Sequence, residues 1–307
     1  MLVSIVINNY NYAEFLEEAI LSALNQSSKS VEVIVVDDGS TDGSRAIIEA
    51  YKNRIIPIFK QNGGQASAFN EGFKASSGEI ICFLDADDYF YPDKVLEISK
   101  IFQKYTEAGW CFHELKEVDK VGQFRPRKRR CIDQFELVSL KHVLLEGSQF
   151  QHRFPATSGL CFRRQTLEEI FPMPDAFKIA ADSFVRLASI YLSPGILSPN
   201  LYAVHRQHGS NLYDFRSDIQ INRSKVGIKS SYYLRERYPS VRLFTNHLFC
   251  SSLRRLIRYT SLREAFDVME ARYYPRKEAS LSFRIKFLVT IAKTYVRRPA
   301  LLRSKRA

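Results

Sequence analysis

The 307-residue chain is 45% hydrophobic and 25% charged, the balance of a soluble globular protein with a sizeable core. No apolar run approaches the roughly 18 residues that a membrane-spanning helix needs, and Met1 leads directly into an apolar segment without a signal-peptide pattern, so we expect neither a spanning nor a secreted protein. The cysteines show no paired metal-binding spacing, and they predict reduced thiols in a cytoplasmic protein.

Charge is distributed unevenly along the chain. Residues 1–100 contain 8 Lys and Arg against 15 Asp and Glu, whereas residues 223–307 contain 21 against 5. A surface this basic attracts anionic partners, either nucleic acid or the anionic inner leaflet of a membrane. We expect a basic C-terminal region with a peripheral membrane role rather than a nucleic-acid-binding one, given the chemistry that the N-terminal motifs described below indicate.

Apolar segments that read as strands alternate with helical patterns in the first 100 residues. The four predicted strands are Val3 to Ile7, Val31 to Val36, Ile55 to Phe59 and Ile80 to Leu84. The helix after the first strand carries its apolar residues at helical spacing: Leu16, Ala19, Ile20, Ala23 and Leu24. This alternation predicts an α/β fold of the Rossmann-like kind, with a mostly parallel sheet and flanking helices.

Each predicted strand ends in polar residues. These ends are Asn8 to Asn11, Asp37 to Ser40, Gln61 to Gly64, and Asp85 to Asp88. Because the carboxyl ends of parallel strands meet at one edge of a sheet, the four loops should converge on one ligand site. Three carboxylates in four residues favour a hard divalent cation with a phosphate-bearing ligand, although an acidic turn capping the helix near Pro92 would explain the same residues.

Four ordered motifs resemble the family 2 glycosyltransferases. They are Val3 to Ile7 with Tyr10-Asn11, Val35 to Asp42, Asn62-Gly63-Gly64 with Asn70-Glu71-Gly72, and Phe83 to Asp88. These inverting enzymes have the GT-A fold and use a nucleotide-diphosphate sugar. The resemblance implies a GT-A domain over residues 1–220, with a nucleotide-sugar half (1–100) and an acceptor half (101–220), followed by a basic, mainly helical region over 221–307.

The resemblance also implies roles for individual residues. Asp85 would contact the ribose, and Asp87, together with His208, would bind Mn²⁺ or Mg²⁺. The implied nucleotide-sugar-binding set is Asn9, Tyr10, Asp37, Asp38, Gly64, Gln65, Asn70, Asp85, Ala86 and Arg206. UDP is the expected nucleotide. Asp37 and Asp38 could instead form a turn that leads into a helix capped by Asp42, and Gly63-Gly64 could be an ordinary strand-to-helix turn rather than a close approach to the donor.

An inverting transfer needs a general base for the acceptor hydroxyl. The family places this residue about 100 positions after the Asp-x-Asp motif, which corresponds to Asp182 here. Ala181 stands before it, where many relatives have Glu. The alternative is that Asp182 only caps a helix.

Two later segments also resemble parts of the family. The segment from Thr157 to Arg164 resembles a strand with acceptor-facing residues, and His205 to Asn211 resembles a loop that closes over the diphosphate. In that loop Arg206 could pair with the diphosphate, and His208 could bind the metal or a phosphate oxygen. A single His is more often structural, which is the alternative for His208.

Near the C-terminus, five apolar residues share one side of a predicted helix: Phe283, Phe287, Leu288, Ile291 and Tyr295. This helix could pack on the catalytic domain, or it could lie on a membrane and bring the enzyme to a lipid-linked acceptor. The basic segment from Arg125 to Arg130 is expected to be a mobile loop near the acceptor side.

The sequence therefore predicts a metal-dependent inverting glycosyltransferase that acts on a saccharide or lipid-linked saccharide acceptor in surface-glycan synthesis. A dinucleotide-dependent oxidoreductase is excluded because no Gly-x-Gly-x-x-Gly turn follows the first strand. A silent domain that binds a nucleotide sugar without transferring it stays open, and a basic nucleic-acid-binding protein would leave the acidic strand ends unexplained.

Overall fold

The computed structural model describes residues 1–125, 132–209, 211, 218–277 and 281–296. Most of the basic segment predicted to be a mobile loop, residues 126–130, lies outside this range. Internal contacts divide the chain into two units, one formed by residues 1–141 and 150–210 and the other by residues 142–149 and 211–307. We call them the sheet unit and the helical unit and describe each by itself.

The sheet unit begins with four parallel strands, as the alternating pattern predicts. They are β1 (Val3–Asn9), β2 (Val31–Asp37), β3 (Ile56–Phe59) and β4 (Ile80–Asp85), in the order β3-β2-β1-β4. The helices between and after them are α1 (Ala13–Leu24), α2 (Ser44–Ala50), α3 (Gln65–Ala75) and α4 (Lys94–Lys104). Strands β1 and β4 are buried on both faces, which explains their continuous apolar runs, whereas the edge strand β3 is partly exposed.

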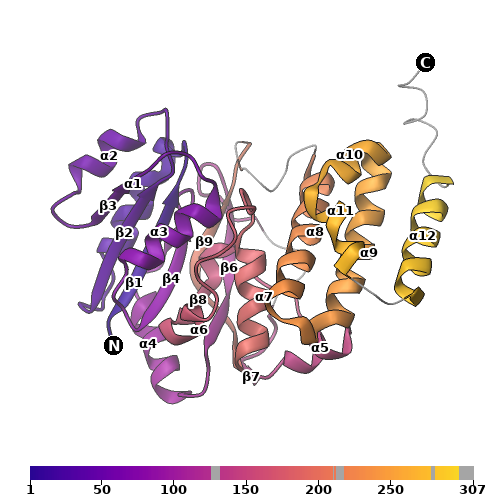
Figure 1. Ribbon diagram of the computed structural model, residues 1–307. Helices are drawn as coiled ribbons and strands as arrows, with labels where there is room; N and C mark the ends of the chain where they lie inside the picture. The colour runs from indigo at the N-terminus through magenta and orange to yellow at the C-terminus, as the bar shows by residue number, and fades with distance from the viewer. Residues whose placement is uncertain (126–131, 210, 212–217, 278–280, 297–307) are drawn as a thin grey trace. The chain divides into compact units, whose positions relative to one another are not determined.

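Helices cover the two faces of this sheet (Figure 1). The apolar side of α1 packs with α4 against Ile5 and Val35 of the strands, so the predicted stripe is core. On the other face, α3 approaches closely at Gly72, where a Cβ atom would lie 2.3 Å from a methyl group of Val6. The α/β architecture with flanking helices is therefore confirmed.

The second half of the sheet is mixed. Strand β8 (Leu160–Arg163) is antiparallel to both β4 and β6 (Trp110–Asp119), and β9 (Gly195–Gln207) runs parallel to β6. Two short strands pair antiparallel with β9, namely β5 (Tyr89–Phe90) and β7 (Glu136–Val138). Within the described residues these strands complete one nine-stranded sheet, and α6 (Arg164–Glu168) and α7 (Asp182–Leu192) also belong to this unit.

Two sequence predictions about this half are wrong in detail. Leu160, Cys161 and Phe162 are at most 1% exposed, so β8 is a core strand and does not present acceptor-facing residues. Only the turn before it, Thr157–Gly159, reaches the acidic loop. The predicted loop from His205 begins later, because the pairing of β9 with β6 keeps His205 and Arg206 in the strand.

The helical unit is built from the predicted C-terminal helices and a short segment from the middle of the chain. Its helices are α5 (Lys141–Glu146), α8 (Ile219–Arg237), α9 (Arg242–Tyr259), α10 (Leu262–Asp267), α11 (Met269–Lys277) and α12 (Leu281–Val296). The segment from 142 to 149 is joined to α9, since His247 Nδ1 lies 2.8 Å from the carbonyl oxygen of Gly147.

The core of the helical unit is aromatic and changes the interpretation of α12. Phe249 stacks on Tyr274 with 4.2 Å between ring centroids, and Phe283 and Phe287 of α12 are buried against this cluster. Both phenylalanines belong to the apolar side for which packing and membrane contact were both open, and for these two residues the structure shows packing within the core of the helical unit. Among the described helices, none is both long and apolar enough to cross a membrane.

Candidate active site

The carboxyl ends of the parallel strands bring the predicted polar residues together. In the sheet register Asn9 of β1 lies opposite Asp37 of β2, and Asn8 lies opposite Asp85 of β4. The side chains are also bonded, because Asn9 Nδ2 donates to Asp37 Oδ1 at 2.8 Å and Asn8 Nδ2 donates to Asp85 Oδ1 at 3.0 Å. The end of β1 therefore fixes one carboxylate on each side.

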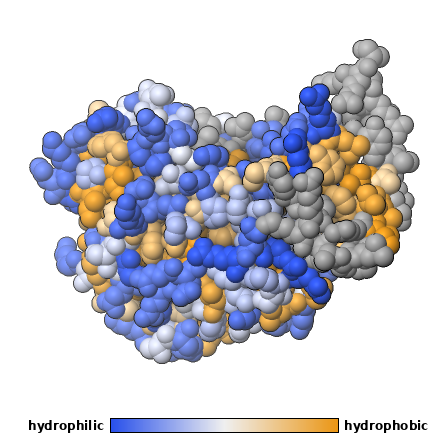
Figure 2. All heavy atoms as spheres, viewed as in Figure 1, coloured by the Kyte–Doolittle hydropathy of each residue, from blue (hydrophilic) through white to orange (hydrophobic). Residues whose placement is uncertain are grey.

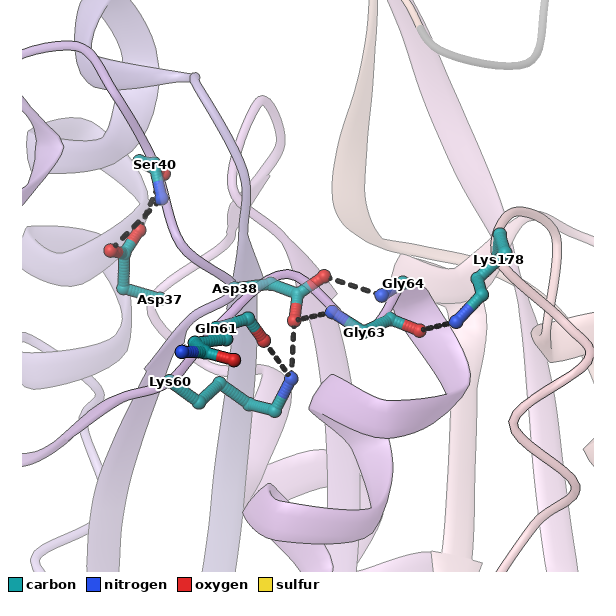
Figure 3. Close-up of polar contacts among 8 residues, drawn as sticks. All are labelled: Asp37, Asp38, Ser40, Lys60, Gln61, Gly63, Gly64 and Lys178. Atoms are coloured by element: carbon teal, nitrogen blue, oxygen red, sulfur yellow. Dashed lines mark hydrogen bonds and ion pairs between the residues drawn. The ribbon is translucent and has the colours of Figure 1, made fainter.

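Asp37 and Asp38 are adjacent in sequence but are held differently (Figure 3). The carboxylate of Asp37 stays in the turn after β2, where it accepts hydrogen bonds from the hydroxyl and the backbone N–H of Ser40. That of Asp38 crosses to the next loop and accepts from the backbone N–H groups of Gly63 (2.8 Å) and Gly64 (2.7 Å) and from Lys60 Nζ (2.6 Å). Asp38 therefore holds the Gly63-Gly64 loop in place.

The first turn of α3 is closed off by protein groups. The backbone N–H groups of Gln65 and Ala66 donate to the carbonyls of Lys178 and Phe177, each at 3.0 Å. Gly64 has a φ of 85° and packs so closely that a Cβ atom would lie 2.5 Å from the Cα of Lys178, which explains the glycine. The N-terminus of α3, expected to approach the donor, is occupied here by the chain segment that leads to Asp182.

An acidic turn follows β4, and its carboxylate oxygens gather in one place. Asp85, Asp87 and Asp88 each offer an oxygen atom, and these atoms lie within 4.8 Å of one another. Asp88 is already used on both sides, because its oxygens accept hydrogen bonds from Ser158 Oγ (2.6 Å) and the backbone N–H of Arg206 (2.9 Å). Asp85 and Asp87 are therefore the better-placed cation ligands of the three.

Two carboxylates of the acidic turn have raised pKa values, because they are buried close to other acidic groups. Burial raises the pKa of Asp85 to about 7, and the neighbouring charges of Asp87 and Asp182 add to the effect. Burial likewise raises the pKa of Asp88 well above its usual range, against the opposing charge of His205. This donor set of carboxylates close together suits a hard divalent cation.

The end of β9 and the residue after it place two histidine side chains beside the turn. His208 Nε2 lies 3.1 Å from Asp87 Oδ2, so the two predicted metal ligands are neighbours. His205 bonds Glu117 through Nδ1 at 2.9 Å; burial alone would lower its pKa, but the charges of Asp88 and Glu117 raise the pKa to about 10. A buried imidazolium therefore compensates part of the acidic turn.

Arg206, predicted to pair with the diphosphate, is engaged elsewhere. Its guanidinium forms an ion pair with Glu18 of α1 and lies over the rings of Phe15 and Tyr89. Its side chain is only 9% exposed. Pairing with a diphosphate would therefore require Arg206 to leave Glu18, and a diphosphate contact by Arg206 stays a prediction.

Asp182 opens α7, as the sequence pattern predicts, and lies near the acidic turn. It is one of the charges that raise the pKa of Asp85, and its carboxylate is 3.3 Å from Arg186 Nη1 one turn along the helix. The N-cap position of this helix is Ala181, so Asp182 is the first helical residue and its charge lies in the first turn of α7. The candidate base and the candidate donor site thus share one edge of the sheet.

The remaining predicted residues differ in their availability. Tyr10 is half-buried in the turn after β1, and Ala86 is buried within the acidic turn. The Asn70 amide is paired on both sides with the backbone of Met173, at 3.0 Å and 2.7 Å, so in this structure it fastens a loop to α3.

Sequence reasoning missed a buried support beneath the acidic turn. Ser158 Oγ bonds Asp88 and also accepts from the backbone N–H of Asp85, while its carbonyl accepts from Lys94 Nζ at 2.8 Å. Lys94 is fully buried, and this burial lowers its pKa. Nothing in the pattern around Thr157-Ser158-Gly159 marks it as a support, because the partners come from distant segments.

Comparison with known proteins identifies the family of this chain. Residues 4–171 match the family model described as Glycosyl transferase family 2. The chain belongs to glycosyl transferase family 2. This family 2 chain is 39% identical to an uncharacterised glycosyltransferase of Nostoc sp., and the match covers 69% of this chain and 66% of that protein. It is 30% identical to an uncharacterised glycosyltransferase of Haemophilus influenzae, with 76% of this chain and 93% of that protein covered. It spans about half the length of the similar Rickettsia typhi protein.

Solved structures share the fold of this family 2 chain. Crystal structures of residues 1–349 of TarS from S. aureus, in one case with UDP-GlcNAc bound, superpose with TM-scores of 0.62 and 0.64 at 16% identity, covering 96% of this chain and 90% of theirs. The mannosyltransferase PcManGT from Pyrobaculum calidifontis, solved with GDP-Man and Mn²⁺, gives 0.53 at 17% identity, covering 96% and 87%. The sheet unit has the GT-A fold, and a helical C-terminal region is present.

Proposed function

We propose that this family 2 chain transfers a sugar, with inversion, from a nucleotide-diphosphate donor to a hydroxyl group of a saccharide or lipid-linked saccharide used in a surface glycan. The observation that carries the proposal is the position of Asp182: it directly follows Ala181, whose N–H donates to Gln65 Oε1 at 2.8 Å, and Gln65 Nε2 donates to Asp85 at 3.2 Å. A candidate general base thereby stands beside the carboxylates that would hold the donor. This arrangement favours transfer over a silent sugar-nucleotide-binding domain.

The donor is proposed to be a UDP-sugar. TarS was solved with UDP-GlcNAc and with UDP, whereas PcManGT was solved with GDP-Man, so the shared fold accepts more than one nucleotide. Asp37, held in place by Asn9 and Ser40, is proposed to accept a hydrogen bond from an N–H of the base. Asp38 is proposed to shape this pocket through the loop it holds rather than to touch the nucleotide.

Mn²⁺ or Mg²⁺ is proposed as the cofactor. Asp87 and His208 would hold it, with Asp85 beside them toward the ribose, because His208 Nε2 lies 3.1 Å from Asp87 and the oxygens of Asp85 and Asp87 lie within 4.8 Å of each other. When bound, the ion would neutralise the charge that develops on the diphosphate leaving group. Asp88 would keep the turn in place through Ser158 and the backbone of β9.

Thermal unfolding of the purified protein tests the donor site. With UDP, GDP, dTDP or CDP, each with and without Mn²⁺, we expect one nucleotide, UDP by proposal, to raise the melting temperature by a few degrees only when Mn²⁺ is present. The Asp85→Asn/Asp87→Asn double variant should lose this ligand-induced increment, measured against its own ligand-free baseline. No increment with any nucleotide, or an equal increment in the double variant, would refute the donor site proposed here.

The helical unit is proposed to contact an anionic membrane surface, where a lipid-linked acceptor would lie. Its described surface carries exposed arginines on α9 (Arg254, Arg255 and Arg258) and an apolar row on α12 that is not part of its core: Ile285 is 53%, Leu288 62% and Val289 42% exposed. Apolar colour on this unit is visible in Figure 2. Exposed apolar and basic residues on the same unit suit binding at an anionic membrane surface.

Vesicle flotation tests this contact with the full chain. We expect binding to vesicles that contain phosphatidylglycerol and little binding to phosphatidylcholine alone, and the Ile285→Glu/Leu288→Glu variant should lose most of it. Val121→Glu, at a 76% exposed position of the sheet unit, is the matched control and should bind like the original chain. Equal flotation of the two variants, or no binding to either vesicle, would refute the membrane contact.

A further inference from the structure

The side chain of Gln65 joins the acidic turn to the segment that carries Asp182. Its Oε1 accepts the backbone N–H of Ala181 at 2.8 Å, and its Nε2 donates to Asp85 Oδ1 at 3.2 Å. Ala181 is the residue immediately before Asp182. A single amide group therefore lies between the candidate base and the candidate ribose carboxylate, which come from opposite halves of the sheet unit.

The amide of Gln65 satisfies both partners at once. A backbone N–H needs an acceptor, and the carboxylate of Asp85 needs a donor, so a residue in this place must offer one of each. A glutamate would oppose Asp85 with a second negative charge, and a lysine could not accept from Ala181. The backbone of Gln65 is fixed independently, because its N–H donates to the carbonyl of Lys178 at 3.0 Å.

The segment that Gln65 holds has an unfavourable backbone conformation. Ala180 has a φ of 51°, in the left-handed region that residues with a Cβ atom rarely adopt, and it is buried. The carbonyls of Phe177 and Lys178 accept from backbone N–H groups at the start of α3, and the N–H of Ala181 donates to the side chain of Gln65; these bonds keep the segment in this shape. Of these, only the bond from Ala181 is made to a side chain, so it can be removed by substitution.

We infer that Gln65 is a positioning residue that sets the place of Asp182 relative to Asp85. This inference rests on the proposed function and changes the role of Gln65 within it, from a contact of the donor to a link between the donor side and the acceptor side. A positioning role predicts that loss of the amide slows the reaction without weakening the donor, because small displacements of a reacting group reduce rates strongly. A donor contact predicts the opposite.

Gln65→Met tests the inference, since methionine keeps the length of the side chain and removes both bonds. Two measurements are made: amide hydrogen exchange of the peptide covering residues 177–184 in the ligand-free protein, and UDP release from UDP-N-acetylglucosamine with MnCl₂. We expect exchange at least about tenfold faster in that peptide, a kcat lowered about 10- to 100-fold, and an unchanged KM for the donor. Lys178→Gln is the matched control, because it removes an exposed bond between the same segments, from Nζ to the carbonyl of Gly63, and should leave both measurements unchanged.

Other outcomes overturn the inference. A raised KM with an unchanged kcat would make Gln65 a donor contact, and unchanged exchange together with unchanged kinetics would leave it without a role in positioning. Exchange that increases throughout the protein would show a general loss of stability instead. If the unsubstituted protein itself releases no UDP and binds no nucleotide, the proposed function fails, and the exchange measurement alone then decides whether Gln65 holds the segment.

Discussion

Replacing Asp182 with asparagine is expected to lower the rate of sugar transfer by a factor of about 10² to 10⁴ while leaving the binding of Mn²⁺ and nucleotide intact. Asparagine has nearly the same shape but cannot take a proton from the acceptor hydroxyl. Its backbone position is set by α7 and by the bond from Ala181 to Gln65, and neither depends on the charge of residue 182. The expected result is therefore a loss of kcat with little change in the KM for the donor.

The measurement is transfer or donor hydrolysis as UDP release, together with the Mn²⁺-dependent thermal shift. Asp175→Asn serves as the control, because Asp175 is an exposed carboxylate in the segment that precedes Ala180. The control should behave like the original protein in both assays. Undiminished UDP release by Asp182→Asn would remove Asp182 from the mechanism.

Replacing Asp85 with asparagine is expected to stabilise the metal-free protein, and increasingly so as the pH rises. The pKa of Asp85 is about 7 in the folded chain against an ordinary value of 3.8, so its stabilising contribution is complete below about pH 4 and is lost as the pH rises to 7. Asparagine removes this loss and can still accept from Asn8 and Gln65. At pH 8 the free energy of unfolding of the variant should exceed that of the original protein by about 2 kcal/mol. This is less than the pKa difference alone would give, because Asp85 is partly exposed and solvent screens its charge.

Thermal unfolding in EDTA from pH 4 to 8 measures this effect. The difference in melting temperature between Asp85→Asn and the original protein should be near zero at pH 4 and should level off above pH 7, at about 5 °C. With Mn²⁺ the original protein should recover stability that the variant does not. A constant difference across this pH range, or a less stable variant at pH 8, would show that Asp85 does not carry uncompensated charge.

Local sequence patterns predicted the sheet and the residues at its edge, because a short segment is enough to show an apolar strand and the polar residues that follow it. The four parallel strands and the polar residues after them could be read from alternation alone. The different roles of Asp37 and Asp38 could not be predicted in this way. Asp37 faces its own turn, whereas Asp38 holds the next loop because Gly63 and Gly64 supply its donors. Adjacent, chemically identical residues acquire different roles from distant partners.

The same limit applies to the second half of the chain, where long-range pairing decides what local patterns leave open. The end of β9 is set by its pairing with β6, which is a long-range property, so His205 and Arg206 were expected in a loop. The charge of Arg206 was expected to be available, but Glu18 of α1 pairs with it. Phe283 and Phe287 have the helical spacing of a surface stripe, and only the position of Phe249 and Tyr274 shows that they are core.

The helical unit is interrupted in sequence, and this limits how the protein can be divided. Its residues 142–149 lie between strands of the sheet unit, and they include the buried Val143 and Leu144 and the Gly147 carbonyl that His247 contacts. A chain cut after residue 209 would keep that segment and lose the α9 residues that belong with it. The helical unit therefore cannot be removed or exchanged as a simple C-terminal tail. A shortened protein, or a chimaera with a relative, has to keep or replace residues 142–149 together with the C-terminal helices.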